Sequence, residues 1–202
     1  ISRGDILLHH PYQSFAPIID FLRQAATDPS VLAIKQTLYR TGPESVMVQL
    51  LADAARAGKE VTVIIELMAR FDEENNLSTA QKLQTAGAHV VYGMVGKKTH
   101  AKMLLVVRRE ANKLHRYVHL GTGNYHQANT RIYTDYGLFT RDKEITQDVH
   151  EIFLQLTTQG PNPELQSLYQ SPFGISDMFV ARANREAQKA RVGKPAHIIA
   201  KV

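Results

Sequence analysis

A histidine and a lysine stand two residues apart in His100-Ala101-Lys102, at the start of a stretch rich in β-forming residues. Alternate side chains of a strand project from the same face, so this spacing places an imidazole beside an ammonium group. A neutral imidazole can attack phosphorus, and an ammonium can neutralise the oxygens around it. The spacing is common by chance, so it predicts phosphoryl chemistry only together with further signals.

A glycine-rich segment about twenty residues later supplies such a signal. Gly121-Thr122-Gly123-Asn124 follows a predicted β-hairpin built from residues 101–109 and 113–120. A hairpin returns the chain to the edge from which it started, so we expect the Asn124 amide to lie near His100. The glycine spacing does not match a nucleotide-binding loop.

The remaining histidines predict no metal centre. His115 and His119 lie four residues apart on one predicted strand, where that spacing does not favour chelation. The chain has no cysteine, which excludes disulfides, Cys-zinc sites and thiol nucleophiles. We therefore expect most histidines other than His100 to be exposed, or buried with their hydrogen bonds satisfied.

Hydrophobic periodicity predicts the scaffold that must position these groups. Apolar residues repeat every three or four positions in residues 15–25 and again in residues 44–57, which favours two amphipathic helices. The apolar runs at 31–38 and 61–65 are typical of parallel strands covered on both faces. The alternation predicts an α/β fold with a mixed, partly parallel sheet and helices on both of its faces.

The C-terminal part of the chain has a different character. Asp142 is predicted to cap an amphipathic helix, and three prolines between residues 160 and 173 mark a boundary. The charged segment 176–191 predicts a further helix, and residues 196–199 have the composition of a strand.

Size and composition limit the class of protein. The chain has 202 residues, 44% of them hydrophobic, and no apolar run reaches the roughly 18 residues that a membrane span needs. It begins at Ile1 without methionine and ends within an apolar run, so we expect a piece of a longer polypeptide that is cytoplasmic, with membrane association left open. The net charge of +5 favours an anionic ligand.

H-x-K followed by G-x-G-N resembles half of the active site of the phospholipase D superfamily, in which two such halves meet. Four longer motifs are I-K-Q-T-L-Y-R-T (34–41), E-L-M-A-R-F-D-E (66–73), K-T-H-A-K (98–102) and L-G-T-G-N-Y (120–125). These four motifs are similar to bacterial polyphosphate kinase, and the similarity extends over essentially the whole chain.

The resemblance implies a domain arrangement. Residues 1–167 correspond to the first phospholipase-D-like catalytic domain, which carries one half-site. Residues 168–202 correspond to a linker helix and the truncated start of the second such domain. The remaining domains of the parent enzyme are the implied partners, together with further copies in a homo-oligomer.

The resemblance also implies an activity, the reversible transfer of the ATP γ-phosphate to inorganic polyphosphate. His100 would carry the phosphoryl group as a phosphohistidine, and Lys102 would assist. Binding of ATP or polyphosphate is implied for four more residues: Arg40, Arg70, Asn124 and Tyr133. Asp135 is a further candidate, for orienting an imidazole.

The family associates Mg²⁺ with Arg40 and Arg70. Both arginines follow predicted parallel strands, at the edge where α/β sheets bind ligands. A guanidinium has no lone pair for a metal, so we expect the ion to bridge phosphate oxygens that the two arginines also hold.

Two other functions remain open. One is a phospholipase-D-like phosphodiesterase or nuclease, which Val107 disfavours because the superfamily usually has an aspartate at that position. The other is a non-catalytic module that binds polyanions. We expect no nucleic-acid partner, and we expect this segment alone to fold but to turn over little substrate.

Overall fold

The structure is a computed structural model that describes residues 4–39, 45–66, 73–93 and 96–200. Arg40 and Arg70 lie outside the described residues. The chain divides into two compact units, residues 1–163 and residues 164–202. The candidate residues that the structure describes all belong to the first unit.

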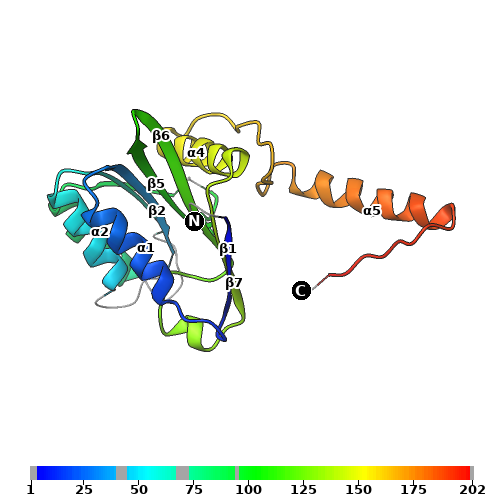
Figure 1. Ribbon diagram of the computed structural model, residues 1–202, viewed down its shortest axis with the longest axis horizontal. Coiled ribbons are helices and arrows are strands. Elements are labelled where there is room, and N and C mark those ends of the chain that lie inside the picture. The colour runs from blue at the N-terminus through cyan, green and yellow to red at the C-terminus, as the bar shows by residue number, and fades with distance from the viewer. Residues whose placement is uncertain (1–3, 40–44, 67–72, 94–95, 201–202) are drawn as a thin grey trace. The chain divides into compact units, whose positions relative to one another are not determined.

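The first unit is built on one seven-stranded sheet (Figure 1). Its strands lie side by side in the order β1-β7-β6-β5-β2-β3-β4. The three strands β2, β3 and β4 are parallel to one another, and the other neighbouring pairs are antiparallel. The predicted mixed, partly parallel sheet is therefore confirmed. The strand bounds are β1 (Ile6–His10), β2 (Val31–Leu38), β3 (Glu60–Ile65), β4 (His89–Tyr92), β5 (Lys102–Glu110), β6 (Lys113–Gly121) and β7 (Asp135–Thr140).

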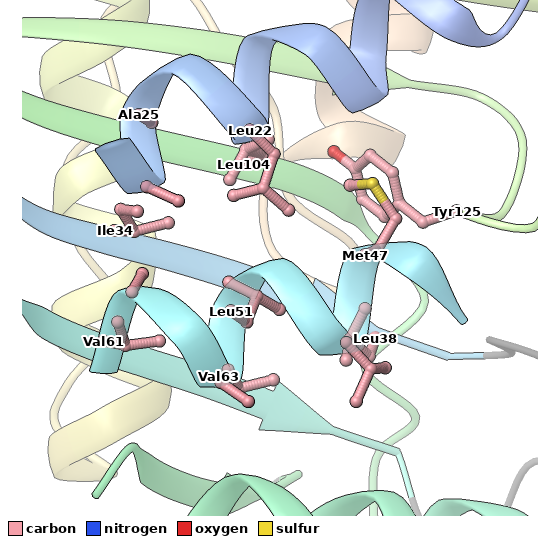
Figure 2. Packing of buried hydrophobic residues seen from close by; sticks show 14 of the residues in the cluster. Leu22, Ala25, Ile34, Leu38, Met47, Leu51, Val61, Val63, Leu104 and Tyr125 are labelled. Atoms are coloured by element: carbon pink, nitrogen blue, oxygen red, sulfur yellow. The ribbon is translucent and has the colours of Figure 1, made fainter. Parts of the chain in front are cut away.

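Helices cover both faces of this sheet, as predicted (Figures 1 and 2). Alternate residues of β5 show the division: Leu104 belongs to the apolar cluster shared with α1 and α2, whereas the buried Met103 and Leu105 point to the opposite face. Helix α4 packs on β5 and β6. The helix bounds are α1 (Ala16–Thr27), α2 (Val46–Arg56), α3 (Glu73–Thr85) and α4 (Lys143–Thr158).

The larger apolar cluster fixes the sheet against α1 and α2 (Figure 2). Leu22 of α1, Leu51 of α2 and Ile34 of β2 are each fully buried within it. Burying one such side chain contributes about 1.5–3 kcal/mol to folding. The edge that carries the candidate site is therefore attached to a well-packed base.

Local sequence determines where the β5–β6 hairpin turns and where α4 begins. Ala111 and Asn112 have φ angles of 43° and 64°, the conformation of a two-residue turn that suits the strand twist. Asp142 caps α4, because its side chain accepts hydrogen bonds from the amides of Glu144 and Ile145, both at 3.0 Å. The hairpin register then sets Lys102 opposite Gly121.

The second unit contains α5 (Ile175–Arg191), which has no buried residue. The strand predicted at 196–199 is wrong, since residues 194–200 have no regular secondary structure. A strand requires a neighbour for its backbone hydrogen bonds, and Ile199 is instead 87% exposed. Within the described ranges, no helix has the length and apolar character needed to cross a membrane.

Candidate active site

His100, Lys102 and the G-T-G-N segment lie at one edge of the sheet. The C-terminal ends of β2, β3 and β6 meet the N-terminal ends of β5 and β7 there, because β5 and β7 run antiparallel to their neighbours. The register places Gly121 between Lys102 on one side and Gly137 on the other. The hairpin thus brings G-T-G-N beside H-x-K, as the sequence predicted.

Lys102 is the first residue of β5, and its backbone is clamped to β2 by Thr37. The Thr37 hydroxyl donates to the carbonyl oxygen of Ala101 at 2.7 Å and accepts from the amide of Met103 at 3.0 Å. Thr37 is buried, with only 2% of its surface exposed, so its hydroxyl makes these hydrogen bonds shielded from water. The position from which the Lys102 side chain starts is therefore fixed by the neighbouring strand.

The Lys102 ammonium lies in a partly desolvated setting. Its Nζ donates to the carbonyl oxygen of His100 and lies 5.4 Å from the centre of the Tyr39 ring. Burial lowers the pKa of Lys102 to about 8, while the Asp135 carboxylate acts in the opposite direction. Lys102 is therefore still mainly cationic at pH 7. Partial burial destabilises its charged form, and an anion bound nearby would stabilise that form.

His100 lies in the loop immediately before β5, so it does not share the strand face with Lys102 as the spacing predicted. The structure brings the two together through the bond from Lys102 to the His100 carbonyl. The imidazole stands edge-on to Tyr39, with ring centres 5.0 Å apart and an angle of 80°. The residue is exposed, so a ligand can reach its ring.

The protonation state of His100 follows from its neighbours. Partial burial lowers the pKa of His100 below its usual value, and the charges of Lys102 and Lys98 lower it further. The imidazole is therefore neutral at pH 7 and has a free lone pair. This is the state that nucleophilic attack requires.

The loop that carries His100 is anchored by residues for which the sequence predicted no role. The buried Glu66, just after β3, accepts a hydrogen bond from the amide of Thr99 at 2.8 Å. Asn76 of α3 donates to the carbonyl oxygens of Tyr39 at 3.1 Å and Glu66 at 2.9 Å. Polar residues directly after apolar strand segments were the signal that could have indicated this network.

The G-T-G-N segment is held by Asp135 at the start of β7. The Thr122 hydroxyl donates to Asp135 Oδ1 at 2.8 Å and accepts from the amide of Tyr136 at 2.9 Å. A Cβ on Gly123 would stand 2.3 Å from Asp135 Oδ2, so any side chain there would displace the Asp135 carboxylate. Asp135 thus orients Thr122 and faces the Lys102 charge; orientation of an imidazole by Asp135 remains a prediction.

The other candidates occupy different settings. Asn124 is half-buried, and its Oδ1 is buried without a hydrogen-bond partner among the described residues. Tyr133 is 61% exposed, in the segment between the short helix η1 (Asn129–Arg131) and β7. Within the described residues, no hydrogen bond or ring contact joins Tyr133 to His100 or Lys102.

The described residues do not provide a set of direct ligands for Mg²⁺. No group of three or more histidine, aspartate and glutamate side chains within them could hold a metal ion. Mg²⁺ requires an oxygen-rich shell at close range. The described side chains therefore do not fit a resident magnesium site.

Comparison with known protein families decides the assignment. The family model described as polyphosphate kinase C-terminal domain 1 matches residues 1–162. The chain belongs to this polyphosphate kinase family. The resemblance that the four motifs indicated is confirmed.

Curated polyphosphate kinases and a crystal structure agree with this family. The chain is 59% identical to a polyphosphate kinase of Xylella fastidiosa and 57% identical to one of Neisseria meningitidis over its whole length. It spans 29% and 30% of those two proteins. The crystal structure of polyphosphate kinase from Porphyromonas gingivalis superposes on 96% of this chain and 32% of its own, with a TM-score of 0.85 and 33% identity.

A more distant likeness confirms the phospholipase-D-like fold. Nuc from Salmonella typhimurium, a phospholipase D family member, covers 80% of this chain and 98% of its own, with a TM-score of 0.60. At 15% identity this similarity concerns the fold alone. The polyphosphate kinase domain therefore shares its sheet architecture with that family.

Proposed function

We propose that this domain supplies the nucleophilic half of a polyphosphate kinase active site, with His100 as the residue that becomes phosphorylated. The observation that carries the proposal is a neutral, exposed imidazole beside a partly desolvated ammonium, at an edge built from five strand ends. Family membership supports the same assignment.

The proposed reaction is a phosphoryl transfer in two steps. The lone pair of a His100 ring nitrogen forms a bond to the γ-phosphorus of ATP, while the bond from that phosphorus to the bridging oxygen breaks. The bonding electrons leave with ADP. A terminal oxygen of polyphosphate then attacks the phosphohistidine, which lengthens the polymer by one phosphate and restores His100.

The proposed role of Lys102 is to neutralise negative charge on the transferred phosphoryl group. Phosphoryl transfer depends mainly on positioning and on neutralising the oxygens of the transferred group. The Lys102 ammonium is held near the His100 backbone by its own hydrogen bond and by Thr37, so little reorganisation is required. Contacts of Arg40, Arg70, Asn124 and Tyr133 with nucleotide or polyphosphate belong to the same proposal. Mg²⁺ would enter on the phosphate oxygens of the substrate.

The rest of the site would come from outside this chain. The chain spans about 30% of the curated polyphosphate kinases it matches. We therefore expect a second half-site, from a second phospholipase-D-like domain, to complete the cleft. The 202-residue chain alone should fold yet show little or no polymer synthesis, and robust synthesis by the purified chain would contradict this expectation.

The test is phosphorylation of the longer enzyme that contains this segment, with ATP labelled at the γ-phosphate. We expect a label that is labile in acid and stable in base, and that disappears in His100→Ala. The control is His89→Ala, which removes an exposed histidine from β4 and should leave the label unchanged. Equal labelling of His100→Ala and the unmodified enzyme would overturn the role of His100.

A further inference from the structure

A small, partly open cavity lies next to the candidate site, between β1, β6, β7 and the G-T-G-N segment. Its volume is about 10 Å³, close to the minimum that one water molecule occupies. The wall includes His10 of β1, His119 of β6, Gly137 of β7 and Asn124. The wall also contains apolar side chains, so the cavity holds a few polar groups within a largely apolar lining. It is too small for a nucleotide or a phosphate.

Three buried polar atoms around this cavity have no hydrogen-bond partner among the described residues. They are Nε2 of His10, Nε2 of His119 and Oδ1 of Asn124. Both histidines are only 2% exposed. An unsatisfied buried donor or acceptor costs about 1–3 kcal/mol, so three of them at one place point to a partner that all of them share.

Gly137 shows that the two histidine nitrogens face the same point. A Cβ on Gly137 would lie 2.7 Å from His119 Nε2 and 3.7 Å from His10 Nε2. The absent side chain thus leaves space between the two rings. In this respect Gly137 differs from glycines that only allow a turn, because the space it leaves lies between polar atoms.

The other nitrogen of each ring determines which hydrogens point into the cavity. His10 Nδ1 lies 2.7 Å from the carbonyl oxygen of Gln13, which can only accept, so Nδ1 carries a hydrogen; the neutral form of the ring then has its lone pair on Nε2. His119 Nδ1 lies 2.9 Å from the Tyr125 hydroxyl. The single hydrogen of that hydroxyl has two acceptors in reach, His119 Nδ1 at 2.9 Å and the carbonyl oxygen of His119 at 3.5 Å. The shorter contact favours donation to Nδ1, which puts the hydrogen of the neutral His119 ring on Nε2.

The buried surroundings keep His119 neutral. Burial lowers the pKa of His119 to about 3. At pH 7 the ring therefore has one hydrogen and one lone pair. The cavity then presents one donor, from His119, and two acceptors, from His10 and Asn124.

We propose that this cavity binds one ordered water molecule that joins β1, β6 and the G-T-G-N segment. The water accepts a hydrogen bond from His119 Nε2 and donates one hydrogen to His10 Nε2 and the other to Asn124 Oδ1. All three buried atoms are then satisfied. Three hydrogen bonds is the usual number for a structural water.

Because of its place in the cavity, this water would position the side chain of Asn124. The Asn124 carboxamide acquires a fixed orientation through the water. A Cβ on Gly121 would lie 3.3 Å from Cε1 of His119 and 3.7 Å from Cβ of Lys102, so the His119 ring and the Lys102 side chain both lie next to the same face of that glycine. The consequence for phosphoryl transfer rests on the proposed function, whereas the existence of the water does not.

The first test is a crystal structure of this chain at high resolution. We expect a single density peak about 3 Å from each of the three atoms, the usual separation for hydrogen bonds. An ordered cavity without density would overturn the proposal. A peak at about 2.0–2.1 Å from the histidine nitrogens with an anomalous signal would identify a metal ion instead, and would also overturn it.

A second test reads the hydrogens directly. Nuclear magnetic resonance of the chain labelled with ¹⁵N-histidine distinguishes the two neutral tautomers. We expect a hydrogen on Nδ1 of His10 and on Nε2 of His119. Finding a hydrogen on Nδ1 of His119 would remove the donor that the water needs and would overturn the arrangement.

A third test fills the cavity. In Gly137→Ala the new methyl group should displace the water, and the Asn124 carboxamide should lose its single orientation in the crystal structure. Gly160→Ala is the control, because a Cβ there meets only the Thr158 hydroxyl, at 3.0 Å. If Gly137→Ala does not fold, the electron density and the histidine tautomers of the unmodified chain still decide whether the proposed water is present. An enzyme that phosphorylates His100 normally but lacks the water would overturn this inference alone.

Discussion

Two histidines of this domain, His100 and His119, share a protonation state but occupy opposite settings. Burial is the largest influence on both pKa values and lowers both, so both rings are neutral at pH 7. His100 is exposed and stands beside the Tyr39 ring, whereas His119 is 2% exposed and hydrogen-bonded to Tyr125. Access to the lone pair, and not the pKa, therefore separates a candidate nucleophile from a structural residue.

Strand register explains the difference between the two settings. His119 is paired with Leu104 of β5 and Phe139 of β7, in a row that faces the main apolar cluster. His100 precedes β5 and lies outside the strand pairing, so no described strand is paired with it. A histidine side chain is therefore held in place within the sheet at position 119, whereas at position 100, at the edge of the sheet, it is accessible to a ligand.

The largest effect should come from His100→Gln in the longer enzyme that contains this segment. Labelling from γ-labelled ATP should fall by about a thousandfold or more, because the covalent step loses its nucleophile. The free energy of unfolding of the 202-residue chain should stay within about 0.5 kcal/mol, since the residue is exposed. Loss of label together with marked destabilisation would place His100 in the structural class of His119.

The next effect concerns Lys102→Met, which keeps the length of the side chain and removes the charge. A hydrogen bond to a charged group contributes about 1.5–3 kcal/mol, so the phosphorylation rate should fall about ten- to hundredfold. Loss of the nearby cation should also raise the pKa of His100. The acid limb of the pH–rate profile should then move to higher pH; an unmoved limb would show that Lys102 does not influence the nucleophile.

The same variant tests the cost of burying Lys102. Burial lowers the pKa of Lys102 to about 8 from the 10.5 usual for lysine, so between these values the unfolded chain binds a proton that the folded chain does not. Stability therefore rises with pH across this window. Chemical denaturation at pH 8 and pH 10 should show a smaller gain for Lys102→Met than for the unmodified chain, and equal gains would contradict a buried ammonium.

The sequence predicted the features of the fold and of the candidate site that depend on hydrophobic periodicity and on the order of the elements along the chain. Strands, helices, the hairpin turn and the approach of G-T-G-N to H-x-K all follow from local patterns. It did not predict that β5 begins at Lys102, since a strand boundary depends on a partner: Thr37 makes its bonds from a distant segment. Nor did it distinguish His119 from other histidines, because burial and the Tyr125 contact depend on how the sheet packs.

A smaller effect is expected where the Tyr125 hydroxyl holds His119. Tyr125→Phe leaves Nδ1 of a buried ring without its partner, which should lower the free energy of unfolding by about 1–3 kcal/mol. Tyr12→Phe is the matched control, because Tyr12 is 79% exposed and should change stability by less than about 0.5 kcal/mol. Equal stability of the two variants in urea would show that His119 does not depend on this hydrogen bond.

The smallest effect should come from replacing Tyr133, which is exposed, as His100 is. Its side chain is 61% exposed and makes no hydrogen bond or ring contact with His100 or Lys102 in the part of the chain that the structure describes. Tyr133→Leu removes a ring that can stack on a base, worth about 1 kcal/mol, so KM for ATP should rise a few-fold at nearly constant kcat. Stability should not change. A fall in kcat with KM unchanged would instead indicate that the ring acts on the transferred phosphoryl group, and would move Tyr133 from the nucleotide to the reacting centre.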